Sequence, residues 1–288
     1  MGRRPADYAE PVRYDAPMTA SSAKLHSGWH GCVGALVLAI AGCTGAGGKQ
    51  APAVEVSPAA ASTTAPAPAA QGRILVFTRT TGFRHDSIPT AVALLRSLAT
   101  ESGLQVEHSE DASLFRDETL RHYRAVVFAS TTGNILDAAQ RAALQRFVRG
   151  GGGYLGVHAA ADTEYSSPWY GELIVARFVS HPPGLQTTRV RFEGDEADAT
   201  APWRVTDELY NYDRNPRAHA HVIATVDEAD YEGGTMGADH PIAWCHDRFG
   251  GRSWYTGLGH DSALYADATY RRHLLRGLRY VVGLAATC

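Results

Sequence analysis

Apolar runs and segments of helical spacing alternate along the chain from residue 73 to residue 157. The apolar runs predict strands over residues 73–78, 104–109, 123–129 and 154–157. Between them, apolar residues recur every three or four positions and predict helices over 88–102 and 137–150. Strands that alternate with helices in this way indicate a parallel sheet with helices on its faces.

The pattern changes in the second half of the chain. Strand-like segments follow one another over 187–192, 220–225, 241–245 and 252–258. An amphipathic helix over 269–282 closes the chain. We therefore expect an α/β fold, in which ligands bind at the carboxyl ends of the strands.

Composition restricts this fold to the later part of the chain. The composition before about Gly72 is unlike that of a folded core, which leaves about 215 residues for a single α/β domain. The formal net charge is −3, and the basic residues do not cluster. Both features argue against a nucleic-acid partner.

The N-terminal part has the pattern of a bacterial export signal. The apolar run Gly34–Gly42 is too short to span a bilayer but is typical of a signal-peptide core, and it ends at Cys43 in a sequence that resembles a lipobox. We predict a lipoprotein signal peptide over 1–43, with Met18 as an alternative start, and a disordered Ala/Pro/Thr-rich tether over 44–72. The expected protein is exported and anchored to the membrane of the bacterial cell envelope by a lipid at Cys43.

The two cysteines of the predicted domain do not form a recognisable framework. Cys245 lies in an apolar segment, and Cys288 is the last residue. A disulfide between them is one alternative in an oxidising compartment, but we expect a buried thiol and a frayed terminal thiol.

Candidate chemistry gathers at three predicted strand ends. His85 and Asp86 follow the first strand, His158 and Asp162 the fourth, and His260 and Asp261 the last. A carboxylate beside an imidazole fixes its tautomer and raises its basicity. Because these strand ends meet at one edge of the sheet, we expect at least two of the histidines to line one pocket.

Three further segments carry groups that suit a sugar ligand. His181 and His240 lie in predicted turns, and residues 207–213 combine carboxylates with tyrosines. Aromatic rings offer a flat surface to the C–H face of a sugar, and carboxylates accept bonds from its hydroxyl groups. We expect residues 207–213 to lie in a loop of the site, and an ordinary surface loop is the alternative for 208–213.

Five ordered segments resemble the ThuA-like, or trehalose utilisation, family. They are TGFRHDSIP (81–89), GGGYLGVHAAAD (151–162), DELYNYDRNP (207–216), HPIAWCH (240–246) and GGRSWYTGLGHD (250–261). The resemblance covers residues 73–285. It implies a fold of the class I glutamine amidotransferase-like type, a flavodoxin-like three-layer sandwich with a mostly parallel central sheet. It also implies a role in the metabolism of disaccharides and keto-sugars.

The resemblance gives His158 a special position. In glutaminases of this fold, the turn after the fourth strand carries the cysteine nucleophile, whereas this chain has His158 there. Without a thiol or hydroxyl group at the turn, a thioester mechanism is excluded, and we do not expect a glutamine amidotransferase. Acid/base chemistry, binding of a divalent, zinc-like metal and a purely structural network remain as alternatives.

We therefore expect an exported enzyme of carbohydrate catabolism that acts on trehalose or a keto-disaccharide as an isomerase, lyase or hydrolase. The alternative is a non-catalytic carbohydrate-binding lipoprotein. The predicted catalytic residues are His158, Glu208, His85 and Asp162, and the predicted substrate-binding residues are Arg84, His181, Tyr210, Tyr212, His240 and His260. The candidate metal ligands are His158, His181, His240 and His260, with Glu208 or Asp162.

Overall fold

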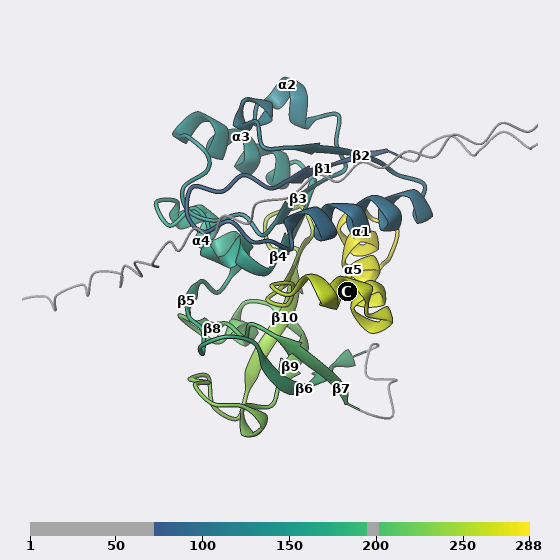
Figure 1. The fold of residues 1–288 in the computed structure, drawn as a ribbon. Coiled ribbons are helices and arrows are strands. Elements are labelled where there is room, and N and C mark those ends of the chain that lie inside the picture. Colours follow the sequence, from purple (N-terminus) through teal and green to yellow (C-terminus); the bar gives the residue numbers. More distant parts are fainter. Residues whose placement is uncertain (1–71, 195–201) are drawn as a thin grey trace, which may run out of the picture. The chain divides into compact units, whose positions relative to one another are not determined.

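The computed structural model describes residues 72–194 and 202–288, and these form one α/β unit (Figure 1). The predicted signal peptide, Cys43 and nearly all of the predicted tether lie outside the described residues.

A nine-stranded sheet with the order β2-β1-β3-β4-β11-β10-β9-β6-β7 forms the centre, and β5 and β8 form a separate small sheet. The strands are β1 (Arg73–Phe77), β2 (Gln105–Ser109), β3 (Ala125–Ala129), β4 (Gly153–Val157), β5 (Phe178–Ser180), β6 (Gln186–Phe192), β7 (Trp203–Asp207), β8 (Asn211–Tyr212), β9 (His221–Val226), β10 (His240–His246) and β11 (Ser253–Thr256). The helices are α1 (Ile88–Glu101), α2 (Asp117–Leu120), α3 (Ala138–Arg149), α4 (Pro168–Ile174) and α5 (Ala268–Val281).

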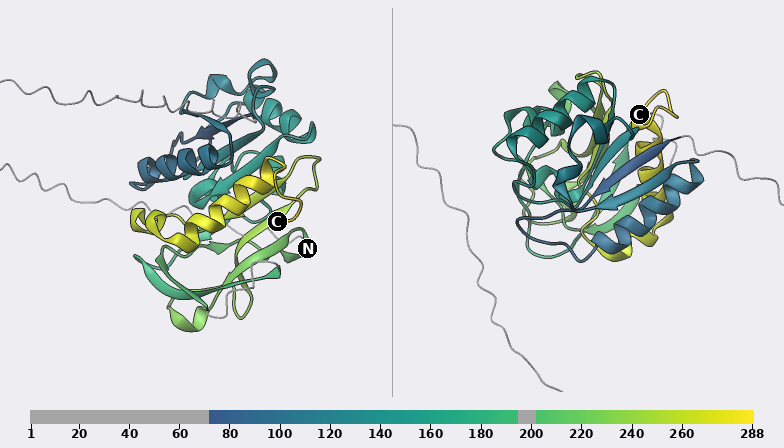
Figure 2. Two further views of the ribbon diagram at one scale, coloured as in Figure 1. Left: turned by 90° about the vertical axis from the view of Figure 1, so that its right-hand side faces the viewer. Right: turned by 90° about the horizontal axis from the view of Figure 1, so that it is seen from above.

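One half of the central sheet is parallel. Strands β2, β1, β3, β4 and β11 pair in parallel, and every residue of β3, β4 and β11 is buried. Helices lie on both faces of this half, α1 and α5 together on one side and α2, α3 and α4 on the other (Figure 2). Continuous apolar runs are stable in such strands because neither face meets water.

The other half of the sheet is antiparallel, so the sheet is mixed and the expectation of a mostly parallel sheet holds for one half only. Buried residues alternate with more exposed ones along β6 and β7. On β6, Thr188 and Val190 are buried, and Arg189 between them is partly exposed. This alternation is typical of an antiparallel sheet with one solvated face.

The predicted elements, including the strand over 252–258, begin and end within two residues of the observed ones. The short elements β5, β7, β8, α2 and α4 were not predicted. Segment 207–213, expected as a loop, contains the last residue of β7 and the whole of β8. Strands and helices this short leave little periodicity to detect.

Backbone conformation and close packing explain why glycines precede and begin β4. Gly151 has φ +98°, a conformation that residues with a side chain rarely adopt, and it turns the chain out of α3. A Cβ atom at Gly153 would clash with the carbonyl oxygen of Val281. The run therefore allows β4 to begin directly after α3 and to pack against the end of α5.

Cys245 and Cys288 form a disulfide, so the expectation of two free thiols was wrong. Their Cα atoms lie 6.4 Å apart, within the range that disulfides span. The chain after α5 folds back toward β10, and Nε of Arg276 donates a hydrogen bond to the carbonyl oxygen of Cys288 at 2.8 Å. This return of the C-terminal tail had no signal in the sequence.

Replacing Cys288 with serine is expected to lower the free energy of unfolding by about 2–4 kcal/mol, because the bond closes a long loop in the unfolded chain. Urea denaturation under oxidising conditions measures the change. Reductant should destabilise the wild type to a similar degree and leave the Cys288→Ser variant unchanged. A wild type that is insensitive to reductant would show that the disulfide does not form.

Among residues 72–194 and 202–288, no helix combines the length and apolar character that crossing a bilayer requires.

Candidate functional site

His158 occupies a strained turn directly after β4. Its φ is +51°, it has no exposed surface, and a 3₁₀ turn over His158–Asp162 follows. A residue with a side chain holds this conformation only where its surroundings enforce it. Here the Tyr255 hydroxyl group donates to the His158 carbonyl oxygen at 2.9 Å. The backbone at His158 thus has a strained strand-end geometry similar to the one that presents a nucleophile in some α/β enzymes.

The tautomer of His158 follows from its neighbours. Nδ1 lies 2.8 Å from the carbonyl oxygen of Gly257, which can only accept a hydrogen bond. Nδ1 therefore carries a hydrogen, and the neutral ring keeps its lone pair on Nε2. Three groups surround this atom: Nε2 of His85 at 3.1 Å, the Tyr210 hydroxyl group at 3.0 Å and Oε2 of Glu208 at 3.5 Å.

Glu208 connects these buried groups to two histidines nearer the surface. Its Oε2 lies 3.3 Å from Nδ1 of His260, and its Oε1 lies 3.3 Å from Nδ1 of His181. We call His85, His158, Glu208 and His260 the histidine–glutamate cluster, since one ligand atom from each lies within 4.8 Å of the others. The residues come from the ends of β1, β4, β7 and β11, as expected for a site at the carboxyl edge of the sheet.

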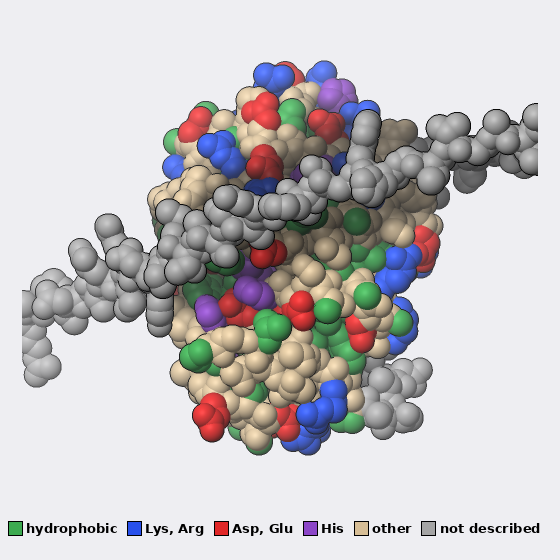
Figure 3. All heavy atoms as spheres, in the orientation of Figure 1, with side chains coloured by type: hydrophobic (Ala, Val, Ile, Leu, Met, Phe, Trp, Pro, Cys, Tyr) green, Lys and Arg blue, Asp and Glu red, His purple; other side chains and the backbone are tan. Residues whose placement is uncertain are grey.

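The cluster is closed on one side and open on the other. The side chains of Glu208, His260 and His181 are 10%, 28% and 38% exposed, whereas His158 has no exposed surface. The space-filling view shows histidine and acidic side chains together on the face seen in Figure 1 (Figure 3). A ligand from solvent would therefore meet Glu208, His260 and His181 first.

Burial and mutual contact set the charges of the cluster. Burial, reinforced by His158 and His260, lowers the pKa of His85 to about 3, so this ring is neutral at neutral pH. Burial disfavours ionisation of Glu208, but the facing nitrogens of His158 and His260 outweigh it and hold the pKa of this carboxyl group well below its ordinary range. The contact with Glu208 raises the pKa of His260. At neutral pH the neutral ring of His85 therefore lies close to the anionic carboxylate of Glu208.

Asp207 holds the loop that carries His260, a role that the sequence did not reveal. Its fully buried carboxyl group accepts hydrogen bonds from the backbone N–H groups of Gly259 at 2.6 Å and Asp261 at 2.8 Å. Burial raises the pKa of this carboxyl group. The position of Asp207 directly before Glu208 was its only signal in the sequence.

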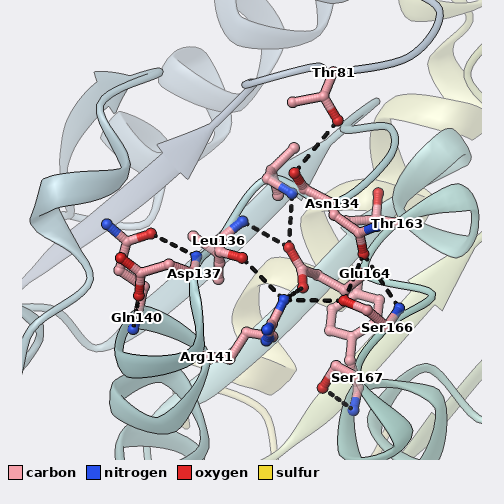
Figure 4. Close-up of polar contacts among 12 residues, drawn as sticks. Thr81, Asn134, Leu136, Asp137, Gln140, Arg141, Thr163, Glu164, Ser166 and Ser167 are labelled. Atoms are coloured by element: carbon pink, nitrogen blue, oxygen red, sulfur yellow. Dashed lines mark hydrogen bonds and ion pairs between the residues drawn. The ribbon is translucent and has the colours of Figure 1, made fainter.

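Glu164, another carboxylate after β4, has a structural role (Figure 4). Its Oε1 accepts hydrogen bonds from the backbone N–H groups of Ile135 and Leu136, each at 2.7 Å. Its Oε2 forms an ion pair with Arg141 of α3 at 3.0 Å, and the side chain is fully buried. Glu164 therefore connects the loop after β3 to the segment after His158 and stabilises the turn at His158.

Asp162 and Tyr210 lie beside the cluster. The carboxyl group of Asp162 accepts a hydrogen bond from the Tyr165 hydroxyl group at 2.8 Å, and burial raises the pKa of Asp162. The Tyr210 ring lies against His158, with ring centroids 4.4 Å apart.

Three predicted site residues are not brought into the cluster. Arg84 points to the carboxyl end of β2, where it forms an ion pair with Glu110 at 2.7 Å. Tyr212 is buried, and its hydroxyl group lies 3.3 Å from that of Tyr255. His240 is fully buried, and both of its ring nitrogens have protein partners.

The partners of His240 show what it does. Its Nδ1 lies 2.8 Å from Oε1 of Glu228, and its Nε2 lies 2.9 Å from the carbonyl oxygen of Tyr210. A ring with both nitrogens engaged has no lone pair left for a metal or a substrate. His240 therefore anchors the backbone of Tyr210, two residues beyond Glu208.

A separate cavity of about 720 Å³ lies at the opposite edge of the sheet. Its lining includes Arg124, Gly152 and Arg252, at the amino ends of β3, β4 and β11, and it contains no residue of the cluster. Ligands of α/β sheets bind at the carboxyl ends of the strands, so the cluster is the stronger candidate for the functional site.

The fold and the site define a class: an α/β protein with a mixed sheet whose strand-end turn presents a histidine in a buried histidine–glutamate cluster. The family model described as "Trehalose utilisation" (ThuA) matches residues 73–281. The chain belongs to the ThuA family. No curated protein matches it.

Solved structures agree with this assignment. A putative ThuA-like protein from Bacteroides uniformis is 22% identical, with a TM-score of 0.65, over 75% of this chain and 93% of that protein. A second putative ThuA-like protein, from Parabacteroides merdae, is 19% identical, with a TM-score of 0.62, over 75% of this chain and 91% of the other. At these identities the likeness establishes the fold alone.

Proposed function

We propose that this ThuA domain is an enzyme of carbohydrate catabolism, acting on trehalose or a keto-disaccharide at the histidine–glutamate cluster. The family description supports the substrate class. We also propose that its fold is a three-layer sandwich of the class I glutamine amidotransferase-like type. We do not propose glutaminase chemistry for it. The helices on both faces of the parallel strands and the strained turn at His158 support that comparison.

The observation that carries the proposal is the position of His158. The strained turn holds an imidazole, with Nε2 3.5 Å from Oε2 of Glu208, at the place where a related fold would hold a nucleophile. Strain of this kind costs about 1–3 kcal/mol and occurs mainly at functional sites, such as active sites and ligand clamps.

The exposed and the buried residues of the site have different roles in this proposal. Glu208 and His181, and with them His260, are open to a ligand, whereas His85 and His158 hold Glu208 from the buried side. A keto-sugar has acidic C–H bonds next to its carbonyl group. Removal of such a proton by an exposed group moves the C–H electron pair toward the carbonyl oxygen, and the resulting enolate can be reprotonated or can expel the glycosidic oxygen.

A substrate panel tests the proposal. The purified protein is incubated with trehalose, other disaccharides and their 3-keto forms, and products are followed by chromatography while calorimetry measures binding. We expect turnover of at least one of these sugars. Saturable sugar binding without any product would instead favour a non-catalytic carbohydrate-binding lipoprotein.

Phe83 is expected to form an apolar platform for the sugar. Its ring is 67% exposed, although it lies only 4.9 Å from the His85 ring, centroid to centroid. Replacing Phe83 with alanine should raise KM about 10-fold and leave kcat nearly unchanged, because the stacking supports the ground state and the transition state alike. Steady-state kinetics measures both. A Phe83→Ala variant with unchanged KM would exclude the platform, and Leu284→Ala, at a distant exposed apolar residue of the C-terminal tail, serves as the matched control.

We also propose that the protein is exported and anchored to the bacterial envelope through a lipid at Cys43. The disulfide between Cys245 and Cys288 supports this, since disulfides persist mainly outside the cytoplasm. Replacing Cys43 with serine should move the protein from the membrane fraction to the soluble fraction, as measured by fractionation and immunoblotting. Retention of the Cys43→Ser variant in the membrane would contradict the anchor.

A further inference from the structure

More polar groups converge on Nε2 of His158 than one lone pair can satisfy. Nε2 of His85, the Tyr210 hydroxyl group and Oε2 of Glu208 all lie within 3.5 Å of it. Only one donor can occupy the lone pair of a neutral imidazole, and the hydrogen on Nδ1 is already committed to Gly257. The remaining contacts have no hydrogen bond to explain their closeness.

Two other nitrogens are left unpaired in the same place. Nδ1 of His85 and Nδ1 of His260 are buried and have no hydrogen-bond partner among the described residues. Nδ1 of His260 lies 3.3 Å from Oε2 of Glu208 but without the alignment of a hydrogen bond. Buried polar atoms without partners are costly, and an ion site is one cause of such an atom at Nδ1 of His260. The atom of His85 that faces His158 is Nε2, so the unpaired Nδ1 of His85 does not count toward the site.

We propose that the histidine–glutamate cluster is a binding site for one divalent transition-metal ion, with His85, His158, His260 and Glu208 as its ligands. Three imidazoles and a carboxylate form a nitrogen-rich set that suits Zn²⁺ and its first-row neighbours and does not suit Mg²⁺ or Ca²⁺.

The distances within the cluster fit a tetrahedral ion. Ligands about 2.0–2.1 Å from a tetrahedral Zn²⁺ lie about 3.3 Å from one another. The nitrogens of His85 and His158 are 3.1 Å apart, His158 and Glu208 are 3.5 Å apart, and Glu208 and His260 are 3.3 Å apart. All four ligand atoms lie within 4.8 Å, so small rotations of the side chains would complete the coordination.

The surroundings of His158 are those of a metal ligand. Imidazole ligands usually donate their second N–H group to a carbonyl or carboxylate oxygen, which fixes the ring and makes it a better electron donor. Nδ1 of His158 does this toward Gly257 at 2.8 Å. The Tyr210 hydroxyl group, 3.0 Å from Nε2 of His158, adds a neutral polar neighbour to the site.

One side of this site remains open. Glu208 and His260 are partly exposed, so a water molecule or a substrate oxygen can approach the ion from the surface. There a divalent ion would polarise a sugar carbonyl group. Nδ1 of His181 contacts the Pro182 carbonyl oxygen at 2.7 Å, so Nε2 of this ring, outside the ligand set, would be the atom that moves a proton. This Lewis-acid role rests on the proposed function, whereas metal binding itself does not.

Elemental analysis and calorimetry test the proposal without an activity assay. The purified protein is analysed for metals by mass spectrometry, stripped with chelator and titrated with Zn²⁺, Mn²⁺ and Co²⁺. We expect one ion per chain and saturable binding of at least one of these metals. A protein that carries no stoichiometric metal and binds none of the three overturns the proposal, even if it turns over sugars.

Variants separate this site from adventitious binding. His158→Asn and Glu208→Gln should each weaken metal affinity by about 100-fold or more, because each removes a ligand. His260→Asn, at a partly exposed position, should act in the same direction if the buried variants fail to fold. His122→Asn, at an exposed histidine away from the cluster, should bind metal like the wild type. Equal affinity in the wild type and all the cluster variants contradicts the site, whereas metal binding without sugar turnover would contradict only the proposed function.

Discussion

Replacing His158 with asparagine is expected to lower kcat for the carbohydrate substrate by about 10³-fold while the protein remains folded. Asparagine tolerates positive φ better than other residues with side chains, so it suits the +51° turn. Its amide can also donate to the carbonyl oxygen of Gly257 in place of Nδ1. What the variant loses is Nε2, the atom that contacts His85, Tyr210 and Glu208. Removing a positioned acid/base or metal-ligating group costs about 10²–10⁴ in rate.

Steady-state kinetics and a thermal melt measure the outcome for His158→Asn. The melting temperature should stay near that of the wild type, and binding of the sugar should weaken much less than turnover. His122→Asn is the matched control, since it makes the same chemical change at an exposed histidine away from the cluster. A His158→Asn variant with wild-type kcat would remove His158 from the mechanism.

Replacing Asp207 with asparagine is expected to lower both stability and activity. Asp207 accepts from two buried N–H groups, and an amide offers only one acceptor oxygen, so one of these groups loses its partner. An unsatisfied buried donor costs about 1–3 kcal/mol in the free energy of unfolding. Because the same loop positions His260, kcat should also fall, by about 10-fold or more, since small misplacements of a catalytic group slow a reaction strongly.

Asp111→Asn is the matched control for Asp207→Asn. Asp111 also accepts a backbone hydrogen bond, from Ser113 at 2.9 Å, but it is exposed to water. Asparagine caps such turns as well as aspartate does, so the control should change the free energy of unfolding by less than about 0.5 kcal/mol. Urea denaturation of both variants makes the comparison. Equal, small effects would show that Asp207 does not hold the His260 loop.

The parallel half of the fold was accessible from the sequence because its strands are long enough and apolar enough to be distinctive. Segments such as 125–129 and 153–157 are buried at every position, and burial on both faces produces the continuous apolar run that marks them. The strand β7 lacks this mark, since exposed and buried residues alternate over five positions. The direction in which β7 and β10 pair depends on contacts between distant segments, which local patterns do not record.

The meeting of three histidines at one edge of the sheet was predictable for a similar reason. His85, His158 and His260 follow strands whose carboxyl ends share an edge, so topology alone brings them together. His240 begins β10, a strand that runs antiparallel to β11, and its side chain contacts Glu228 and the Tyr210 carbonyl oxygen away from the cluster. Asp207 and Glu208 are neighbours in the chain, and the sequence did not show which of them reaches the histidines.

A solvent-exchange measurement tests directly whether the histidine–glutamate cluster is a reaction centre for carbohydrates. A 3-keto-disaccharide is incubated in D₂O with the wild type and with His158→Asn, and proton NMR follows the C–H groups beside the carbonyl. We expect the wild type to exchange these protons for deuterium well above the uncatalysed rate and His158→Asn not to do so. Exchange at the same rate with both proteins, or with neither, would contradict the claim.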